Sequence, residues 1–377
     1  MDRIAIVGAG IGGLTAALAL ARRDIESVVF EQQAALPDEG AGIQISPNAA
    51  AELRELGLGA AFDTAARPAH REIRRWHDNA VITRTDLGRY DVPYYTMRRG
   101  ALIGALRRAV IQFGRRCVSV TEESLGFADG SVEHPGTVVG ADGLHSVVRG
   151  LVAQDRPRYS GFVAARAVLP IAAPPRVTVW LGPQRHCVAY PVDHGRHLNL
   201  VVVGPAADPP ARPTRVTGGA LLAGFDGWHP AVRELIGLAG QAELRALHDR
   251  PPIPRWHRGR VVLIGDAAHP MLPFISQGAA QAVEDATTLA RCARRPDALA
   301  HFEALRRHRV DEVAALSRAG ARAFHLEDGD EQRARDRAMA AAPPDSHDWL
   351  YGYRVASLFR RCDTSSTRDA SPSFRKI

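Results

Sequence analysis

The chain has 377 residues, of which 46% are hydrophobic and 24% are charged, and its formal net charge is +7. This length suggests two domains or one large domain, and the composition is that of an ordinary globular protein. The arginines are scattered along the chain in short pairs, and no apolar run approaches the ~20 residues of a membrane span. We therefore expect neither a nucleic-acid partner nor a membrane partner.

The cysteine and histidine patterns indicate no metal site. The four cysteines are Cys117, Cys187, Cys292 and Cys362. They lack the C-x-x-C spacing of zinc sites and the density of a disulfide framework, so we expect a reducing cytoplasm. The histidines show no metal-ligand spacing, and His269 is expected to be structural. A strand that begins by Arg3 leaves no room for a signal peptide.

The N-terminal part of the chain alternates between strand-like and helix-like segments. An apolar run over residues 4–7 precedes a glycine turn and an apolar helix, and a second strand over residues 27–32 ends in an acid. Helices are predicted over residues 47–59 and 100–113, and a buried strand over residues 137–143. This alternation is typical of an α/β domain with a parallel sheet.

The pattern changes after Arg149. Short β-like runs over residues 160–204, separated by turn residues, predict an antiparallel sheet. Residues 218–248 look helical, a buried strand returns at Arg260, and the chain is then mostly helical to about Phe359. The predicted fold class is therefore α/β: a Rossmann-like nucleotide-binding domain interrupted by an antiparallel β-sheet domain, with helices at the C-terminus.

The expected division of the chain follows from these patterns. The first part of the nucleotide-binding domain covers residues 1–155, a β-rich domain covers 156–255, and the second part of the nucleotide-binding domain covers 256–325. C-terminal helices are expected over residues 326–362, and a polar, disordered tail over residues 363–377.

The glycine turn near the N-terminus predicts a dinucleotide site. Gly8, Gly10 and Gly13 fit the pattern G-x-G-x-x-G between a strand and a helix. The first glycine permits the turn, the second lets the backbone approach a pyrophosphate, and the third lets helix and strand pack closely. Glu31 lies 18 residues after Gly13 at the end of the next strand, where an acid binds a ribose hydroxyl.

A second stretch, VVLIGDAAHPMLPFISQGAAQAVEDA (residues 261–286), favours a flavin over a nicotinamide nucleotide as the bound molecule. Asp142 and Asp266 both end strands, which implies one extended ligand that crosses several strand ends. Pro273 would shape a loop beside a flat ring, and residues 277–279 would present backbone N–H groups from a helix start. A reduced flavin is an anion, and a helix N-terminus stabilises it by about 1 kcal/mol.

Three motifs in this order give the chain a specific resemblance. GAGIGGLTAALAL, VVGADGLHSVVR (residues 138–149) and GDAAHPMLPFISQGAAQAVEDA resemble the signatures of the single-component FAD-dependent aromatic monooxygenases, the p-hydroxybenzoate hydroxylase superfamily. Within it, the chain is most similar to the salicylate, 3-hydroxybenzoate and 6-hydroxynicotinate hydroxylases. AGIQISPNA (residues 41–49), MRRGAL (residues 97–102) and the stretch from HLEDGDEQRARDRAM to DWLYGY (residues 325–353) match secondary features, so the likeness spans about residues 3–355.

The resemblance implies a set of FAD-binding residues. Arg99 would lie near the phosphates or the ribityl chain, Asp142 near the pyrophosphate and Asp266 at the ribityl chain. Cys117 would meet the adenine through its backbone, although an ordinary buried cysteine fits the pattern equally well. The full expected set is Gly8, Gly10, Ile11, Gly12, Gly13, Glu31, Gln32, Arg99, Cys117, Asp142, Asp266, Gln277, Gly278 and Ala279.

The sequence departs from the family pattern at two places. Ser276 stands where the family usually has glycine or alanine. Residues 116–136 are shorter than the usual three-stranded unit, and this difference concerns the adenine contacts rather than the chemistry.

The resemblance also implies the chemistry. NADH or NADPH would reduce FAD, O₂ would add to the reduced flavin to give a C4a-hydroperoxide, and one oxygen would pass to an electron-rich aromatic ring. His186 and Tyr190 are the expected catalytic residues, because a spacing of four puts both on one face of a strand. The pattern alone does not exclude a surface histidine and a core tyrosine. The expected substrate-contacting residues are Gln44, Arg166, Pro273 and Phe274.

Several alternatives stay open at this stage. The same chemistry could act on a natural-product intermediate, and a flavoprotein reductase, an oxidase or a non-catalytic FAD-binding protein could share the frame. Flavin halogenases usually carry a W-x-W-x-I-P segment, which this sequence lacks. The expected partner is a small aromatic substrate, and the chain is expected to be a monomer or a homodimer. The sequence leaves open the choice between NADH and NADPH and whether hydroxylation removes a carboxylate.

Overall fold

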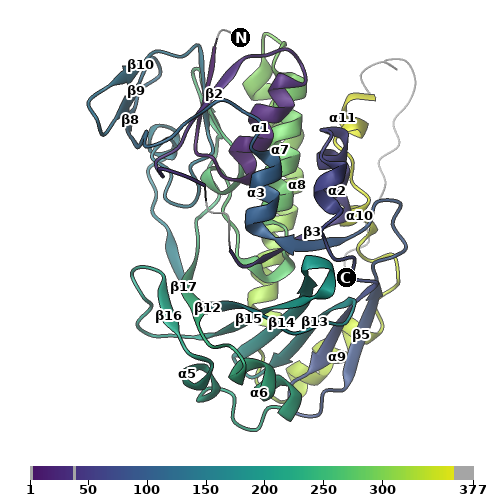
Figure 1. Ribbon diagram of the computed structural model, residues 1–377. Coiled ribbons are helices and arrows are strands. Elements are labelled where there is room, and N and C mark those ends of the chain that lie inside the picture. The colour runs from purple at the N-terminus through teal and green to yellow at the C-terminus, as the bar shows by residue number, and fades with distance from the viewer. Residues whose placement is uncertain (1–2, 37–39, 361–377) are drawn as a thin grey trace.

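The computed structural model describes residues 3–36 and 40–360 of the chain. Two sheets dominate the fold: a six-stranded, largely parallel sheet at one end and an eight-stranded, largely antiparallel sheet at the other (Figure 1). The long helix α8 (Ala298–Ala323) runs from the first sheet toward the second. This arrangement confirms the predicted fold class.

In the six-stranded sheet, the strands follow the order β18-β19-β11-β1-β2-β7. They are β1 (Ile4–Val7), β2 (Ser27–Phe30), β7 (Ile111–Gln112), β11 (Thr137–Gly140), β18 (His257–Arg258) and β19 (Val261–Leu263). β1 pairs in parallel with β2 and β11, and β11 pairs in parallel with β19. Every residue of β1 and β11 is buried, as expected for a parallel sheet covered on its faces.

Helices cover this sheet and share its core. They are α1 (Ile11–Ala21), α2 (Pro47–Glu55), α3 (Arg99–Leu106), α7 (Gly278–Cys292) and the first half of α8. One hydrophobic core contains side chains from β1, α1, α3, α7 and α8. The helices α1 and α7, which are far apart in the sequence, therefore lie together against the same sheet (Figure 1).

The eight-stranded sheet has the strand order β16-β17-β12-β15-β14-β13-β4-β5. Its strands are β4 (His70–Arg75), β5 (Val81–Asp86), β12 (Arg158–Leu169), β13 (Arg176–Gly182), β14 (Arg185–Val192), β15 (His197–Pro205), β16 (Thr214–Val216) and β17 (Ala242–Asp249). All neighbours are antiparallel except β13 and β4.

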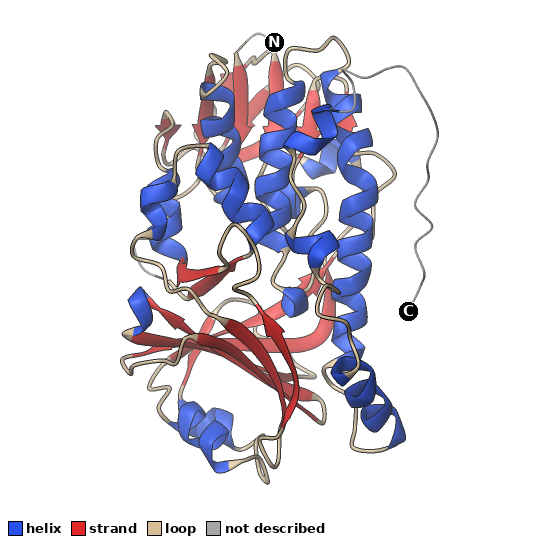
Figure 2. Ribbon diagram, turned by 90° about the vertical axis from the view of Figure 1, so that its right-hand side faces the viewer, coloured by secondary structure: helices blue, strands red, loops and turns tan. Residues whose placement is uncertain are grey.

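The register of this sheet separates two faces. Leu181 pairs with His186 and Val179 with Val188, so His186, Val188 and Tyr190 point to one face, because side chains alternate along a strand. Cys187 and Ala189 point to the other face, where they join a core with α5 (Gly218–Leu222) and α6 (Pro230–Gly237). Figure 2 shows these two helices below the sheet, and the six-stranded sheet with its helices above it.

Smaller elements complete the fold. β3 (Gly42–Ile45) pairs with β6 (Tyr95–Arg98), and β8 (Cys117–Val120), β9 (Leu125–Phe127) and β10 (Val132–Glu133) form a three-stranded sheet. The segment 116–136, although shorter than is usual in the family, thus still forms three strands. The remaining helices are α4 (Arg149–Val152), α9 (Asp330–Ala340), α10 (Asp348–Tyr351) and α11 (Ala356–Arg360). Among the described helices, none is both long and apolar enough to cross a membrane.

Two predicted helices are wrong in part. Residues 242–249, inside the stretch predicted as helical, form strand β17, because pairing with β12 overrides their helix-forming composition. The helix predicted over residues 100–113 ends at Leu106, and Ile111–Gln112 form the edge strand β7. Helix propensity is a weak signal beside such tertiary pairing.

The strands β4 and β5 were not anticipated from the sequence. They precede residue 156, yet they hydrogen-bond into the eight-stranded sheet. The division at residues 155, 255 and 325 stays a proposal, with the addition that residues 70–86 pair with the second sheet. The predicted disordered tail, residues 363–377, lies outside the described residues.

Candidate active site

The carboxyl ends of four neighbouring parallel strands meet along one edge of the six-stranded sheet. Gly8 follows β1, Glu31 follows β2, Asp142 lies two residues after β11, and Asp266 lies three residues after β19. Ligands of open α/β sheets bind at this edge. The sheet order therefore brings together four sequence-predicted positions that lie up to 258 residues apart.

The glycine turn fits the close approach of a pyrophosphate. Gly8 has φ +104°, and a β-carbon on Gly13 would lie 2.0 Å from the Gly8 carbonyl oxygen. A β-carbon on Gly10 would meet no protein atom within 4 Å, so this glycine leaves open space rather than filling a packing contact. No side chain caps α1, which begins at Ile11, and no acid stands in its first turn. Its free N–H groups can thus bind phosphate oxygens.

The same turn lies against the helix that starts after Gln277. A β-carbon on Gly12 would stand 3.3 Å from the β-carbon of Ala282 and 3.8 Å from Ile264. The glycine turn and the Asp266 segment are therefore neighbours, and one elongated cofactor can contact both. The residues present fit FAD at this edge of the sheet.

Glu31 is buried and fixes the turn. Its carboxylate accepts hydrogen bonds of 2.8 Å from the backbone N–H groups of Ala9 and Gln33. Each carboxylate oxygen keeps a further lone pair, which could accept a ribose hydroxyl. Gln32 is exposed beside it, and no hydrogen bond of its side chain is found among the described residues.

Asp142 and Arg149 hold the loops around the cofactor edge. The Asp142 carboxylate accepts from Ser146 Oγ at 2.5 Å and from the N–H groups of Val147 and Val148. Arg149 is fully buried and donates to the carbonyl oxygens of Ala267 and Ala268. Arg149 thereby connects the motif at residues 138–149 to the motif at residues 261–286. This role of Arg149 was missed by the sequence analysis, because the two carbonyl groups lie more than 100 residues away from it.

Asp266 presents a free carboxylate next to a helix start. It is exposed, and no hydrogen bond among the described residues uses its oxygens. Arg99, on α3, interacts with it electrostatically. Helix α7 begins at Gly278 with no acid in its first turn, so the N–H groups of Gly278 and Ala279 remain available to an anionic ring edge.

The turn before α7 is held by side chains on both sides. Ser276 has the left-handed backbone φ of 53°, and the Gln277 side chain points into the protein, where it donates to Ser46 Oγ and accepts from Asn48. Only the backbone of Gln277 is therefore placed to contact a cofactor. Asp285 accepts from the Gly265 N–H at 2.9 Å and lies 2.6 Å from His269 Nε2, which gives His269 the expected structural role.

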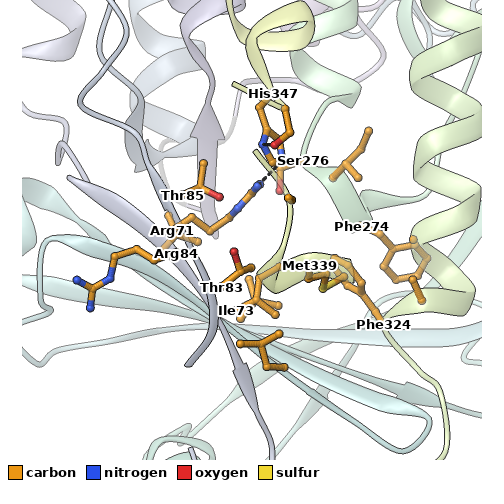
Figure 3. Close-up of a pocket in the computed structure, with 18 of the residues that line it drawn as sticks. Arg71, Ile73, Thr83, Arg84, Thr85, Phe274, Ser276, Phe324, Met339 and His347 are labelled. Atoms are coloured by element: carbon orange, nitrogen blue, oxygen red, sulfur yellow. Dashed lines mark hydrogen bonds between the residues drawn. The ribbon is translucent and has the colours of Figure 1, made fainter. Parts of the chain in front are cut away.

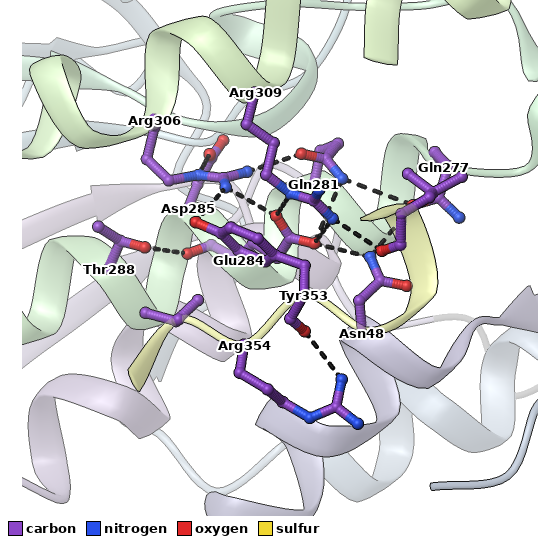
Figure 4. A network of polar contacts seen from close by, with 12 residues as sticks. Asn48, Gln277, Gln281, Glu284, Asp285, Thr288, Arg306, Arg309, Tyr353 and Arg354 are labelled. Atoms are coloured by element: carbon purple, nitrogen blue, oxygen red, sulfur yellow. Dashed lines mark hydrogen bonds and ion pairs between the residues drawn. The ribbon is translucent and has the colours of Figure 1, made fainter. Parts of the chain in front are cut away.

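A buried network of charges connects α7 to α8 (Figure 4). Arg306 donates to Glu284 and Asp285, and Arg309 forms two hydrogen bonds with Glu284. Glu284, Asp285 and Arg306 are fully buried. The neighbouring His269 and Arg306 lower the pKa of Asp285 to about 2, against the opposing effect of burial. Asn48 of α2 donates to the same Glu284. The start of α7 is thus fixed by paired charges rather than by apolar packing alone.

Two cavities adjoin this helix start. The large cavity, of about 750 Å³, lies between the eight-stranded sheet and the C-terminal segment; Figure 3 shows part of its lining. The small cavity, of about 570 Å³, contains Asp266, Gly278 and Ala279 in its lining. Both cavities share the residues Gln44, His186, Val188, Pro273 and Ser276. A flat ring at the α7 start would therefore face the large cavity across these shared residues.

His186 is held by a relay of hydrogen bonds. His325 Nδ1 lies 2.7 Å from the Ala321 carbonyl oxygen, which can only accept, so this nitrogen carries a proton. His325 Nε2 must then accept from His186 Nδ1 at 2.8 Å. The Nε2 atom of His186 is left as a free acceptor. Burial lowers the pKa of His186 well below its usual value, so the ring is neutral near pH 7.

The other predicted substrate residues are divided between the cavities. Tyr190 and Arg166 line the small cavity, and burial lowers the pKa of Arg166. Tyr190 shares the sheet face of His186 but is not part of the lining of the large cavity. Gln44 accepts from the Tyr94 hydroxyl at 2.8 Å and lines both cavities. Phe274 lines the large cavity, 5.6 Å from the His186 ring.

Cys117 is buried in β8, and its thiol lies 3.6 Å from the Ser119 carbonyl oxygen. Burial raises the pKa of this thiol to about 11. Such a thiol stays protonated and unreactive at neutral pH, so any contact of this residue with a cofactor would use its backbone.

Comparisons with known proteins agree with this geometry. Residues 2–293 match the family described as FAD binding domain. A 3-amino-4-hydroxybenzoate 2-monooxygenase of Streptomyces platensis is 44% identical over 392 residues, which cover 95% of this chain and 98% of that protein. A 6-hydroxynicotinate 3-monooxygenase of Bordetella bronchiseptica is 33% identical and covers 94% of this chain and 95% of that protein.

Solved structures show the same fold. HpxO of Klebsiella pneumoniae, in complex with FAD and uric acid, has a TM-score of 0.81 and 26% identity, and the match covers 95% of this chain and 97% of that chain. The resemblance read from the three motifs is confirmed. The chain belongs to the FAD binding domain family and is an FAD-dependent monooxygenase.

Proposed function

We propose that this monooxygenase hydroxylates a small aromatic acid or a phenol-like ring with NADH or NADPH and O₂. The observation that supports the proposal is the pair of adjoining cavities, one at the start of α7 and one over the eight-stranded sheet, which share His186. The large cavity is lined by apolar side chains such as Ile73, Val179 and Phe274. An aromatic compound with one or two rings suits such a site. The relatives named above act on hydroxylated aromatic acids.

The cofactor and the protein have separate tasks in this proposal. Bound FAD supplies the redox chemistry, with electrons from the nicotinamide and with O₂ as the oxidant. The N–H groups at the start of α7 stabilise negative charge at the ring edge beside them. The apolar side chains of Val188 and Phe274 in the wall of the large cavity help to keep water from the reacting carbon.

His186 is the proposed base. Its free Nε2 can accept the proton of an aromatic hydroxyl, and the resulting oxyanion donates electrons to the ring carbon that is attacked. The relay through His325 holds the imidazole in the tautomer that this step needs. Tyr190 and Arg166, in the small cavity, are proposed to contact the cofactor ring or the near edge of the substrate.

The alternatives differ in their support. A reductase or an oxidase is not favoured, since the relatives that match the whole chain are monooxygenases. A natural-product intermediate as substrate fits the same cavities. A cytoplasmic location and a monomeric or homodimeric state complete the proposal; the buried free thiols of Cys117, Cys187 and Cys292 support a reducing compartment.

The test measures coupled turnover. The FAD-loaded protein is mixed with NADH or NADPH, and the consumption of nicotinamide and O₂ is followed with and without a panel of hydroxylated benzoates, hydroxypyridine acids and simple phenols. We expect at least one compound to accelerate both rates and to yield a product heavier by one oxygen atom. Acceleration that produces only hydrogen peroxide, with every compound recovered unchanged, would contradict the proposal.

A further inference from the structure

The wall of the large cavity contains a cation without an anionic partner. Arg71 lies on β4, opposite Thr85 of β5 and Val177 of β13, on the sheet face that lines the cavity. In Figure 3 its guanidinium points toward His347, which belongs to the C-terminal segment that covers the cavity. Arg71 was not among the residues predicted from the sequence, because strand β4 itself was not anticipated.

Both partners of Arg71 are neutral. It donates to His347 Nε2 at 2.7 Å and to the Tyr351 hydroxyl at 3.2 Å. Burial lowers the pKa of His347 to about 4, and its Nδ1 lies 3.0 Å from Ser346 Oγ, so Nε2 is free to accept. A guanidinium has five N–H donors. The Nε–H of Arg71 is buried without an acceptor among the described residues.

The nearby carboxylates are engaged elsewhere. Glu72 points to the opposite sheet face and pairs with Arg74, Arg84 and Arg176. Asp348 pairs with Arg89 and accepts from Tyr90. Within the described part of the chain, no carboxylate lies within ion-pair distance of Arg71. A partly buried cation with unused donors and no counter-ion is costly unless a ligand supplies the negative charge.

The sheet register indicates the distance between Arg71 and the proposed base. Arg71 pairs with Val177, and His186 pairs with Leu181 on the other side of the same strand β13. Two strand spacings of about 4.8 Å and four residue rises of about 3.3 Å place the two Cα atoms about 16 Å apart. Both side chains extend into the cavity between them. This gap leaves room for one ring that carries an acid group at one end and a hydroxyl at the other.

We propose that Arg71 binds the carboxylate of the substrate, so that the enzyme selects aromatic carboxylic acids over neutral phenols. This inference rests on the proposed function and narrows its substrate class. The planar guanidinium can offer paired N–H groups to a carboxylate, while His347 and Tyr351 hold it from behind. The hydroxyl of the same ring then lies on the side of His186.

The test compares an acid with its amide. Wild-type enzyme and the variants Arg71→Gln, Arg71→Lys and Arg84→Gln are assayed with 3-amino-4-hydroxybenzoate, or with the aromatic acid from the panel that is turned over fastest, and with the matching carboxamide. Dissociation constants are measured in parallel from the change in flavin absorbance. Arg84 lies on the neighbouring strand β5, but its side chain is 60% exposed and pairs with Glu72 on the opposite face of the sheet, so it is the matched control.

Loss of Arg71 should raise the KM and the dissociation constant of the acid on the order of 10- to 100-fold, with little change for the carboxamide. Arg71→Lys should retain part of the preference for the acid, because it keeps the charge without the planar donors. Arg84→Gln should behave as wild type. Flavin content and the melting temperature report whether each variant folds.

The outcomes separate the two proposals. Two results would overturn the role of Arg71 and leave the proposed function standing. The first is a wild-type enzyme that prefers the carboxamide or a simple phenol. The second is that Arg71→Gln and Arg71→Lys both weaken the binding of the acid and of the carboxamide equally. A wild-type enzyme that hydroxylates no aromatic compound would overturn the proposed function itself.

Discussion

The cofactor edge and the large cavity are built in different ways. At the cofactor edge, backbone atoms of short contiguous motifs do most of the work: the turn from Gly8 to Gly13, the strand ends, and the start of α7. In the large cavity, single side chains from β4, β14, α8 and the C-terminal segment meet, and no sequence motif identifies them. A site built from backbone atoms can be recognised from a local sequence pattern, whereas a site built from single side chains depends on the register of the strands.

The two regions are not independent. Asp285 holds the Gly265 N–H and His269 beside the cofactor edge, and it is itself held by Arg306 of α8. Gly320, near the end of α8, and Phe324, directly after it, line the large cavity. The buried network therefore fixes the cofactor loop relative to the helix that lines the large cavity.

The largest effect on chemistry is expected at His186, one of the residues that line both cavities. His186→Gln removes the proposed base, and kcat should fall about 10²- to 10⁴-fold for a phenolic substrate. His325→Gln should lower kcat less and should shift the pH dependence of kcat, because the tautomer of His186 is no longer fixed. Steady-state kinetics from pH 5 to 9 test both variants. Unchanged kcat in His186→Gln with normal flavin content would remove His186 from the mechanism.

Breaking the link between the regions should affect stability most. Arg306→Met leaves Glu284 and Asp285 buried with one fewer cation, which should cost about 3–5 kcal/mol of unfolding free energy. Arg322→Met, which removes an ion pair exposed on both sides, should cost no more than about 1 kcal/mol. Urea unfolding of both variants measures the contrast. Equal losses would show that the network does not hold α7 against α8.

The proposed approach of the cofactor to the glycine turn can be tested by adding one methyl group, through a glycine-to-alanine substitution. Gly10→Ala places a β-carbon in the open space beside the glycine turn, and Gly104→Ala on α3 places one in open space elsewhere. The first variant should fold and bind FAD at least about tenfold more weakly, since the backbone can no longer approach the pyrophosphate. The second should bind FAD as wild type. Fluorescence titration of the apoprotein with FAD measures both affinities.

Two buried histidines beside the large cavity, His325 and His347, should make the free energy of unfolding depend on pH. Burial lowers the pKa of His325 and of His347 to about 4, whereas an unfolded histidine titrates near 6.5. The unfolded chain therefore binds more protons between about pH 6.5 and 4, so the contribution of each histidine is present above pH 6.5 and is lost as pH falls. Between pH 7 and pH 5, the burial of each histidine should lower the free energy of unfolding by about 2 kcal/mol.

Urea unfolding at several pH values measures this slope. The double variant His325→Gln/His347→Gln should show a flatter dependence between pH 7 and 5 than the wild type. An identical slope in both proteins would mean that the two histidines are not buried as neutral rings.

The smallest effect is expected at Cys117. If this residue meets the adenine through its backbone, Cys117→Ala should leave FAD affinity within about twofold of wild type. A large loss would instead indicate that the thiol itself, or the packing of β8 around it, forms the adenine site. The same fluorescence titration decides between these outcomes.

The difference between the regions also explains what sequence analysis could predict. The glycine turn, Glu31, Asp142 and Asp266 were recognisable because each follows a strand in the local sequence. His186 and Tyr190 were recognisable as a pair, because the period of a strand is local too, although only the register showed which face they occupy. Residues 242–249 were misread because pairing with β12 outweighed their helical composition.

Other residues carry no local signal. Arg71, Arg149 and His325 gain their meaning from partners far away in sequence, and the relay from His325 to His186 spans 139 residues. An arginine on an unrecognised strand looks like any solvated charge. Only the three-dimensional structure shows that Arg71 lacks a carboxylate partner among the described residues, while Arg84, on the neighbouring strand β5, has one in Glu72.

One measurement tests most directly whether the cofactor edge and the large cavity form a single reaction space. The FAD-loaded enzyme is given NAD(P)H and its best aromatic acid under ¹⁸O₂, and the product and the solvent are analysed by mass spectrometry. We predict one labelled oxygen on the aromatic product for each nicotinamide oxidised. Labelled peroxide or water with an unlabelled, unchanged aromatic acid would contradict the account.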